Sequence, residues 1–157
     1  MLVINKYHNQ IKILLAFFII ATTFFSCDNN KENFHLDLFK DIPTDIDGGA
    51  CYYSTTDKDF KQKEYIFIND FGNLAYISVN KTFIKLNLTK QDSLLKQDNL
   101  WSNGHQYTYS NENYEVIITL ANIKAKGLNT SVAKGTIIVK QKGETIATET
   151  FVGECGC

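Results

Sequence analysis

The chain has no arginine, a single proline and a single tryptophan among its 157 residues. Its 16 basic residues are all lysines and stand against 17 acidic ones, so the net charge of -1 lacks the basic excess that a nucleic-acid-binding protein needs. With 44% hydrophobic and 21% charged residues, the composition also excludes a disordered or collagen-like chain and leaves room for about one globular domain. Eight tyrosines and eleven phenylalanines favour strands in that domain.

Long apolar stretches are also scarce, and the one that occurs lies near the N-terminus. Residues 1–12 carry Lys6 and Lys12 and no acidic group, and residues 13–25 are apolar except for two threonines. This is the layout of a secretory signal peptide. At ~1.5 Å per residue the run spans about 20 Å, short of the ~30 Å hydrocarbon core of a bilayer, so a permanent membrane span is disfavoured. A buried core helix is the structural alternative.

The apolar run ends in Phe24-Phe25-Ser26-Cys27, which resembles a bacterial lipobox. The resemblance implies that residues 1–26 are removed as a signal peptide and that Cys27 becomes the first residue, carrying a diacylglyceryl thioether and usually an N-acyl chain. Two or more acyl chains anchor a protein stably to a membrane. We therefore expect a lipoprotein of the cell envelope, with Cys27 as the lipidation site and the outer membrane as its partner, facing either the periplasm or the surface.

The residues that follow divide into a tether and a domain. Residues 27–46 begin with a polar, aperiodic stretch, which is typical of a flexible tether. Apolar residues between Phe34 and Phe39 interrupt it, so its second half can dock as a short segment. Pro43 and the Asp47-Gly48-Gly49 turn mark its end, and residues 47–157 form the predicted β-rich domain.

Within this domain, apolar residues recur with a period of two. Every second residue from Tyr114 to Leu120 is apolar, whereas Glu115 and Thr119 lie on the opposite face, as in a half-buried strand. Seven similar runs occur at residues 50–56, 64–69, 74–80, 82–88, 105–110, 135–140 and 145–152. Short strands in this number predict an all-β fold of about eight strands, either an antiparallel β-sandwich or a small β-barrel.

Turn residues separate several of these strands. Hairpin connections are expected at residues 70–73, at Asn80-Lys81 and at residues 141–144. The exception to the strand pattern is the segment 89–100, whose polar composition around Leu94-Leu95 predicts a helical turn or an ordered loop.

Besides Cys27, the chain contains three cysteines, Cys51, Cys155 and Cys157. Cysteines pair as disulfides in an oxidising envelope, so an odd number leaves one of them unpaired. Cys51 opens the first predicted strand of the domain, and the other two close the chain. A disulfide from Cys51 to Cys155 or Cys157 would tie the ends of the domain together. Closing a loop of ~100 residues stabilises a fold by up to ~4–5 kcal/mol. This disulfide is the leading prediction, and it needs neither a metal nor a cofactor.

Two other uses of these cysteines stay open. Three thiolates with His105 or an aspartate could bind zinc or a soft metal, although the Cys-x-Cys spacing is not that of a zinc knuckle. Alternatively, Cys155-Gly156-Cys157 could exchange disulfides with Cys51, because exchange needs an accessible thiolate beside a reducible bond.

Catalytic patterns are missing from the domain. His105 is its one histidine, and neither a Gly-x-Ser-x-Gly elbow nor a His-Glu-x-x-His pair occurs, so we predict no catalytic residues. Together with Trp101, Tyr107 and Tyr109, this histidine forms a candidate binding surface for a protein or a glycan, because exposed tyrosine and tryptophan favour such contacts. Packing of these rings within the sheet is the alternative.

Longer stretches of the domain resemble a group of lipoproteins. The resemblance to uncharacterised lipoproteins of the Bacteroidetes is carried by residues 47–54, 65–68 and 75–80 and by the final Gly153-Glu154-Cys155-Gly156-Cys157. It implies an envelope location and a small all-β domain. A weaker similarity, to membrane-bound lysozyme inhibitors, is carried by Ser102-Asn103-Gly104 and Tyr107.

These features together predict a lipid-anchored envelope lipoprotein whose domain is a non-catalytic binding or structural module. A thiol-redox or metal-binding protein of the envelope that uses Cys51, Cys155 and Cys157 is the first alternative. A lysozyme-inhibitor-like protein is the second.

Overall fold

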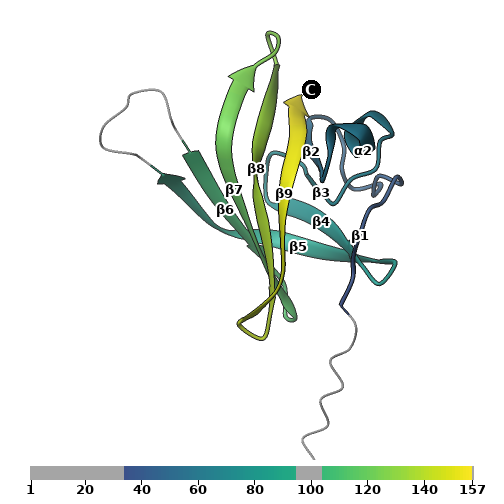
Figure 1. The fold of residues 1–157 in the computed structure, drawn as a ribbon. Helices are drawn as coiled ribbons and strands as arrows, with labels where there is room; N and C mark the ends of the chain where they lie inside the picture. Colours follow the sequence, from purple (N-terminus) through teal and green to yellow (C-terminus); the bar gives the residue numbers. More distant parts are fainter. Residues whose placement is uncertain (1–33, 95–103, 157) are drawn as a thin grey trace, which may run out of the picture. The chain divides into compact units, whose positions relative to one another are not determined.

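The computed structural model describes residues 34–94 and 104–156, which belong to the folded unit Phe34–Cys157. Within these residues the chain forms nine strands and one short helix (Figure 1). The elements are β1 (Leu36–Asp37), β2 (Ala50–Ser54), α2 (Asp57–Lys61), β3 (Phe67–Asn69), β4 (Leu74–Val79), β5 (Thr82–Leu94), β6 (Gly104–Ser110), β7 (Tyr114–Ala125), β8 (Thr130–Gln141) and β9 (Glu144–Gly156). No helix in the described ranges has the length and apolar character to cross a membrane.

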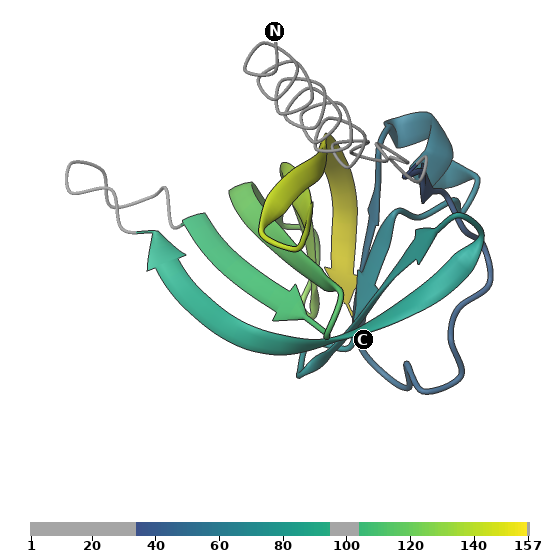
Figure 2. The same ribbon diagram turned by 90° about the horizontal axis from the view of Figure 1, so that it is seen from below.

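The strands β2 to β9 form a closed barrel in which each strand pairs antiparallel with the next (Figure 2). The last strand, β9, pairs with β2 along all of Ala50–Ser54 and closes the barrel. The short strand β1 is an addition, since its two residues pair with the end of β4. The predicted all-β fold is confirmed, and of the two expected architectures the structure is an eight-stranded β-barrel.

All eight strand runs expected from the period of two are present, with changed ends. The largest change is in β5, which runs on through residues 89–94 and pairs there with β6. The helical turn or ordered loop expected over 89–100 is therefore wrong for 89–94, while 95–100 lie outside the described residues. Cross-strand hydrogen bonding outweighs the polar composition here, and a register shift between Leu88 and Lys90 marks a bulge in the strand.

The helix α2 is not among the elements expected from the sequence. It begins after Thr56, whose hydroxyl accepts a hydrogen bond from the backbone N–H of Asp59 at 3.1 Å. The Asp59 carboxylate in turn accepts hydrogen bonds from the hydroxyls of Thr55 and Thr56 at 2.7 and 2.6 Å. A threonine followed three positions later by an acidic residue is a helix-start signal, and it is visible in the sequence.

Two tight turns have the geometry that the hairpin prediction requires. The φ angles are 49° at Asn80 and 64° at Lys81, and 52° at Lys142 and 83° at Gly143. Positive φ at both central residues is typical of type I′ turns, whose twist matches that of paired antiparallel strands. The predicted hairpins at these two positions are confirmed.

Aromatic rings pack across the inside of the barrel. The ring of Tyr53 lies 4.2 Å from that of Phe151 and 5.6 Å from that of Phe67 between centroids, and Phe67 lies 5.4 Å from Tyr109. All four side chains are buried. Gly153 makes room for this stack, because a Cβ at that position would overlap the Tyr53 ring. The middle of the barrel is therefore a packed core.

A second apolar cluster joins the segment before β2 to the barrel. It contains Phe39, Tyr65 and outward-facing residues of β2, β3 and β4. Phe39 is buried, and its backbone N–H and carbonyl both form hydrogen bonds with Tyr65 at 2.8 Å. Phe34 and Leu36 also pack against the barrel core. The folded unit thus begins at Phe34, before the boundary expected at residue 47.

A disulfide joins Cys51 of β2 to Cys155 of β9. The two cysteines are direct partners in the register of these strands and lie 104 residues apart in the sequence. The predicted disulfide from Cys51 to one of the two terminal cysteines is confirmed, with Cys155 as the partner. It covalently links the first and last strands of the barrel at the seam where the barrel closes.

Candidate functional site

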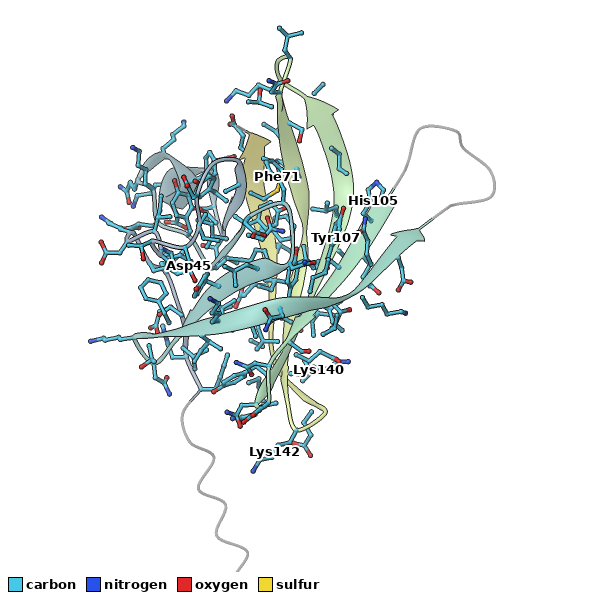
Figure 3. The ribbon with its side chains drawn as sticks, turned by 180° about the vertical axis from the view of Figure 1, so that it is seen from behind. Asp45, Phe71, His105, Tyr107, Lys140 and Lys142 are labelled. Atoms are coloured by element: carbon cyan, nitrogen blue, oxygen red, sulfur yellow. A yellow bond between two sulfur atoms is a disulfide. The ribbon has the colours of Figure 1, made fainter. Side chains whose placement is uncertain are left out.

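One end of the barrel holds a cavity of about 310 Å³, termed here the mouth cavity. Its walls come from every barrel strand except β4 and from the turn between β3 and β4. Figure 3 shows three of its lining residues, Phe71, His105 and Tyr107, at this end of the barrel, with Lys142 at the opposite end. Residues far apart in the sequence therefore meet at one opening.

Strand β6 contributes three side chains to the cavity, because alternate residues of a strand share a face. His105, Tyr107 and Tyr109 follow one another along that face. Tyr109 lies deepest, with 1% of its surface exposed, whereas His105 and Tyr107 are half-buried. The rings of His105 and Tyr107 lie 6.2 Å apart between centroids (Figure 3).

Another part of the wall follows one row of paired residues. Asn69 pairs with Cys51, Cys51 with Cys155, and Cys155 with Ser131. This row brings an amide, the disulfide and a hydroxyl next to one another on four neighbouring strands. The hydroxyl of Tyr53 lies 3.5 Å from the Sγ of Cys155. The disulfide is therefore part of the cavity wall and fixes the strand next to Asn69.

Two buried polar atoms of the cavity lack a hydrogen-bond partner among the described residues, Oδ1 of Asn69 and Nδ1 of His105. Asn69 is 8% exposed, and its Nδ2 donates a hydrogen bond to the Tyr109 hydroxyl at 2.6 Å. The Tyr109 hydroxyl therefore occupies one end of the amide, and the oxygen at the other end is unpaired. Leaving a buried polar group unpaired costs about 1–3 kcal/mol. Two such groups in one cavity point to a bound partner.

The described lining of the cavity includes no aspartate, glutamate or lysine. Burial raises the pKa of Tyr109 to about 12, and it also raises the pKa of Tyr53 and of Tyr107 above the ordinary value of 10.0. All three tyrosine hydroxyls are therefore protonated at neutral pH and can donate or accept hydrogen bonds. The cavity presents neutral donors and acceptors.

Apolar side chains stand at the rim of the cavity. Phe71 is 51% exposed and Ile123 is 41% exposed. Phe71 lies in the turn between β3 and β4 with a φ of 60°, a conformation that is uncommon for a large side chain. The carboxylate of Asp70 stabilises this turn by accepting hydrogen bonds from the backbone N–H groups of Gly72 and Leu74 at 2.8 and 3.0 Å. The turn thus keeps an aromatic ring at the entrance.

The structure brings together three of the four residues predicted to form a binding surface. His105, Tyr107 and Tyr109 line the inside of the barrel mouth instead of an outer face. For Tyr109 the alternative of packing within the sheet applies, because its ring lies in the core and its hydroxyl accepts a hydrogen bond from Asn69. The fourth residue, Trp101, lies outside the described residues.

Two of the cysteines predicted to be functional also lie at this cavity. Cys51 and Cys155 line the mouth cavity as a disulfide. In the part of the chain that the structure describes, no three His, Cys, Asp or Glu side chains are grouped to hold a metal ion. Besides Trp101, the predicted positions Cys27 and Cys157 and the Ser102-Asn103 pair of the lysozyme-inhibitor similarity lie outside the described residues.

Sequence reasoning missed the polar residues Asn69, Gln91 and Ser131. Asn69 carried a signal, since it follows the apolar run 65–68 at a strand end where a buried side chain is expected. Gln91 and Ser131 carried none, because each lies among polar neighbours in the sequence. Closure of the barrel alone brings them to the cavity.

A larger groove of about 630 Å³ lies outside the barrel, between α2 and the strands β7, β8 and β9. Its charged groups include exposed lysines, and one of them, Lys126, pairs with Glu154 at 2.7 Å. Exposed charges are solvated or paired with one another and so do not require a ligand. The mouth cavity is smaller, but its polar groups are buried and unpaired, which makes it the candidate site.

No protein-family model matches this chain, and comparisons with curated proteins and with solved structures give no match either. Its class is therefore defined by fold and site: a closed antiparallel barrel with a disulfide at its seam and a neutral, polar cavity at its mouth. The interior of an eight-stranded barrel is just wide enough to be filled by side chains or to hold one small ligand.

Proposed function

We propose that this chain is a lipoprotein of the cell envelope, anchored to the outer membrane through Cys27, whose barrel binds a small ligand in the mouth cavity. The barrel acts as a non-catalytic binding module. The observation that carries this proposal is the pair of buried, unpartnered polar atoms, Asn69 Oδ1 and His105 Nδ1, on residues that line one cavity without carboxylates or lysines in its described lining.

The barrel supports binding because it forms the cavity in advance. Each wall strand is hydrogen-bonded to a neighbour on both sides, and the disulfide locks the β2–β9 seam. A ligand that enters a preformed site loses less free energy in ordering the protein. No carboxylate in the described lining accompanies His105, so these residues offer no acid–base pair for catalysis.

The anchor in this proposal is supported by the sequence, since an apolar run of signal-peptide length ends at the lipobox-like Phe24-Phe25-Ser26-Cys27. Intact-mass analysis of the protein from its native membrane tests it. For the wild type we expect the mass of a chain that starts at Cys27 and carries acyl groups. For the Cys27→Ser variant we expect the mass of an unacylated chain that keeps residues 1–26. An unacylated wild-type protein would contradict the anchor and leave the cavity proposal standing.

Ligand binding is tested with the full-length chain in mild detergent, screened against neutral and charged small molecules by the change in Tm. A ligand at 100 times its Kd stabilises a protein by about 2.7 kcal/mol, so we expect a clear rise in Tm. His105→Leu should abolish the rise. The matched control is His35→Leu, because His35 is a histidine whose side chain is 74% exposed before β1.

The two histidine variants separate the outcomes. Loss of the Tm rise in His105→Leu, with retention in His35→Leu, supports binding in the mouth cavity. A rise that persists in His105→Leu and in Asn69→Leu would place the ligand elsewhere and contradict the proposal.

One observation favours thiol exchange as a second candidate function: the Cys51–Cys155 disulfide lines the same cavity, beside the Tyr53 hydroxyl. A structural disulfide resists mild reductant, whereas an exchange site is readily reduced. Thiol alkylation followed by mass analysis distinguishes the two. Rapid labelling of both Cys51 and Cys155 under mild reduction would favour the redox function over the binding module.

A further inference from the structure

We infer that the ligand of the mouth cavity is a neutral, polyhydroxylated ring, that is, an uncharged sugar, either free or as the terminal residue of a glycan. The inference rests on the proposed binding role of the cavity and names the class of ligand that its walls fit.

The first argument is the charge of the cavity. Its described lining consists of amide, hydroxyl, imidazole, disulfide and apolar groups, without a carboxylate or an ammonium group. A charged ligand would lose its hydration there and gain no opposite charge, which is costly. The cavity therefore selects against acidic and amino sugars and against phosphorylated compounds.

The second argument is the hydrogen bonding of Asn69. One end of its amide is taken by the Tyr109 hydroxyl at 2.6 Å, so the amide offers a single atom to a ligand. A nucleobase edge that pairs with an amide uses both ends at once, as in the recognition of adenine by asparagine. A ligand hydroxyl needs one end, and it can pair with either an oxygen or an NH₂ group.

The imidazole of His105 leads to the same ligand class. Its buried Nδ1 accepts a hydrogen bond in one tautomer and donates one in the other. A hydroxyl group satisfies both cases, because it is donor and acceptor at once. A ligand hydroxyl can therefore pair with the imidazole in either tautomer.

The third argument is the size and shape of the cavity. Its volume of about 310 Å³ equals that of about ten water molecules at ~30 Å³ each, near the lower limit for small-molecule pockets. That room suits one hexose ring. The half-buried ring of Tyr107 in the cavity wall offers apolar surface for the C–H groups of such a ring. Phe71 is half exposed at the rim, so a glycan can continue outward from the bound ring.

The test is a calorimetric titration of the full-length chain in mild detergent. The probes are neutral hexoses and N-acetylhexosamines, each free and as the terminal residue of an oligosaccharide. Glucuronic acid, glucosamine and adenosine serve as acidic, basic and heteroaromatic comparisons. We expect at least one neutral sugar to bind about tenfold more tightly than its charged analogues, because an unpaired buried charge is penalised. If the oligosaccharides bind and the free sugars do not, the ligand is the terminal residue of a glycan.

Variants locate the bound sugar. Tyr107→Ala should weaken binding about tenfold, since it removes both a ring face and a hydroxyl from the wall. Tyr114→Ala is the matched control, because Tyr114 is also a half-buried tyrosine but does not line the cavity. Gln91→Ala changes an exposed side chain of the lining, so it should keep the fold and weaken binding several-fold.

The outcomes separate this inference from the function on which it rests. If the chain prefers glucuronic acid, glucosamine or adenosine and Tyr107→Ala weakens that binding, the inference of a neutral sugar is contradicted. The proposed ligand-binding function of the cavity is then supported. Sugar binding that neither Tyr107→Ala nor Gln91→Ala affects would place the sugar outside the cavity and overturn the inference. Failure of all probes, together with a negative ligand screen, would overturn both.

Discussion

At the scale of single residues, the mouth cavity depends on side chains that combine a buried body with a polar end. Tyr109 is the deepest of them: its ring packs edge-on against Phe67 and its hydroxyl meets the Asn69 amide. The ring contributes to the core, while the hydroxyl occupies one end of the amide and leaves the other end for a ligand. A single residue thus links the packed middle of the barrel to its open end.

Burial of Tyr109 predicts how stability changes in alkali. Its pKa is near 10.0 in the unfolded chain and about 12 in the folded protein. Between these values the unfolded chain has released a proton that the folded chain retains. The free energy of unfolding therefore falls as the pH rises through this window, by up to about 1.4 kcal/mol per pH unit for one tyrosine. Below the unfolded pKa this loss is absent.

Urea unfolding at pH 8, 10 and 11 checks this expectation. Tyr109→Phe should be less stable than the wild type at pH 8, because it loses the bond to Asn69, but its stability should decline less steeply above pH 10. Equal slopes for the two proteins would show that burial of this phenol does not govern the alkaline loss.

At the scale of secondary-structure elements, local and distant pairings differ. Hairpins such as β4–β5 and β8–β9 are formed by neighbours in the sequence and are favoured by their type I′ turns. The seam between β2 and β9 instead joins strands from opposite ends of the domain. Its formation has to overcome the entropy of closing a long loop, and the Cys51–Cys155 disulfide acts at this point.

The disulfide therefore stabilises the least local pairing of the barrel. We expect the double variant Cys51→Ser/Cys155→Ser to lose up to about 4–5 kcal/mol of unfolding free energy, the upper value for a closed loop of about 100 residues. Calorimetry should show a Tm lowered by several degrees. Cys157→Ser is the control and should leave Tm unchanged. A decrease of less than about 2 °C in the double variant would contradict the role of the disulfide as a staple.

At the scale of the whole folded unit, the segment before β2 belongs to the barrel. Phe39 is 8% exposed and is paired through its backbone with Tyr65, and β1 extends the sheet at β4. We expect a chain shortened to residues 34–157 to unfold at the same urea midpoint as the full-length protein. A chain shortened to 47–157 should lose at least about 2 kcal/mol, because burying one phenylalanine contributes about 1.5–3 kcal/mol. Equal midpoints for the two shortened chains would show that this segment is dispensable.

Much of the fold could be predicted from local patterns, whereas the site could not. Alternating residues such as those from Tyr114 to Leu120 identify strands because side chains on a strand alternate in direction. The helix after Thr56 also has a local signal, because this threonine stands three positions before the acidic Asp59. By contrast, Asn69 and His105 are 36 positions apart in the sequence, and no local pattern predicts that they line one cavity.

The sequence by itself determined the strands, the hairpin turns and the presence of a disulfide-forming cysteine at each end of the domain, since these follow from side-chain alternation and short-range turn chemistry. Tertiary structure alone decided that the sheet closes as a barrel, that Cys155 is the partner of Cys51, and that Asn69, His105 and the disulfide share a cavity. The physical reason is the register between distant strands. A shift of one residue along β2 or β9 would turn Cys51 or Cys155 to the opposite face of its strand.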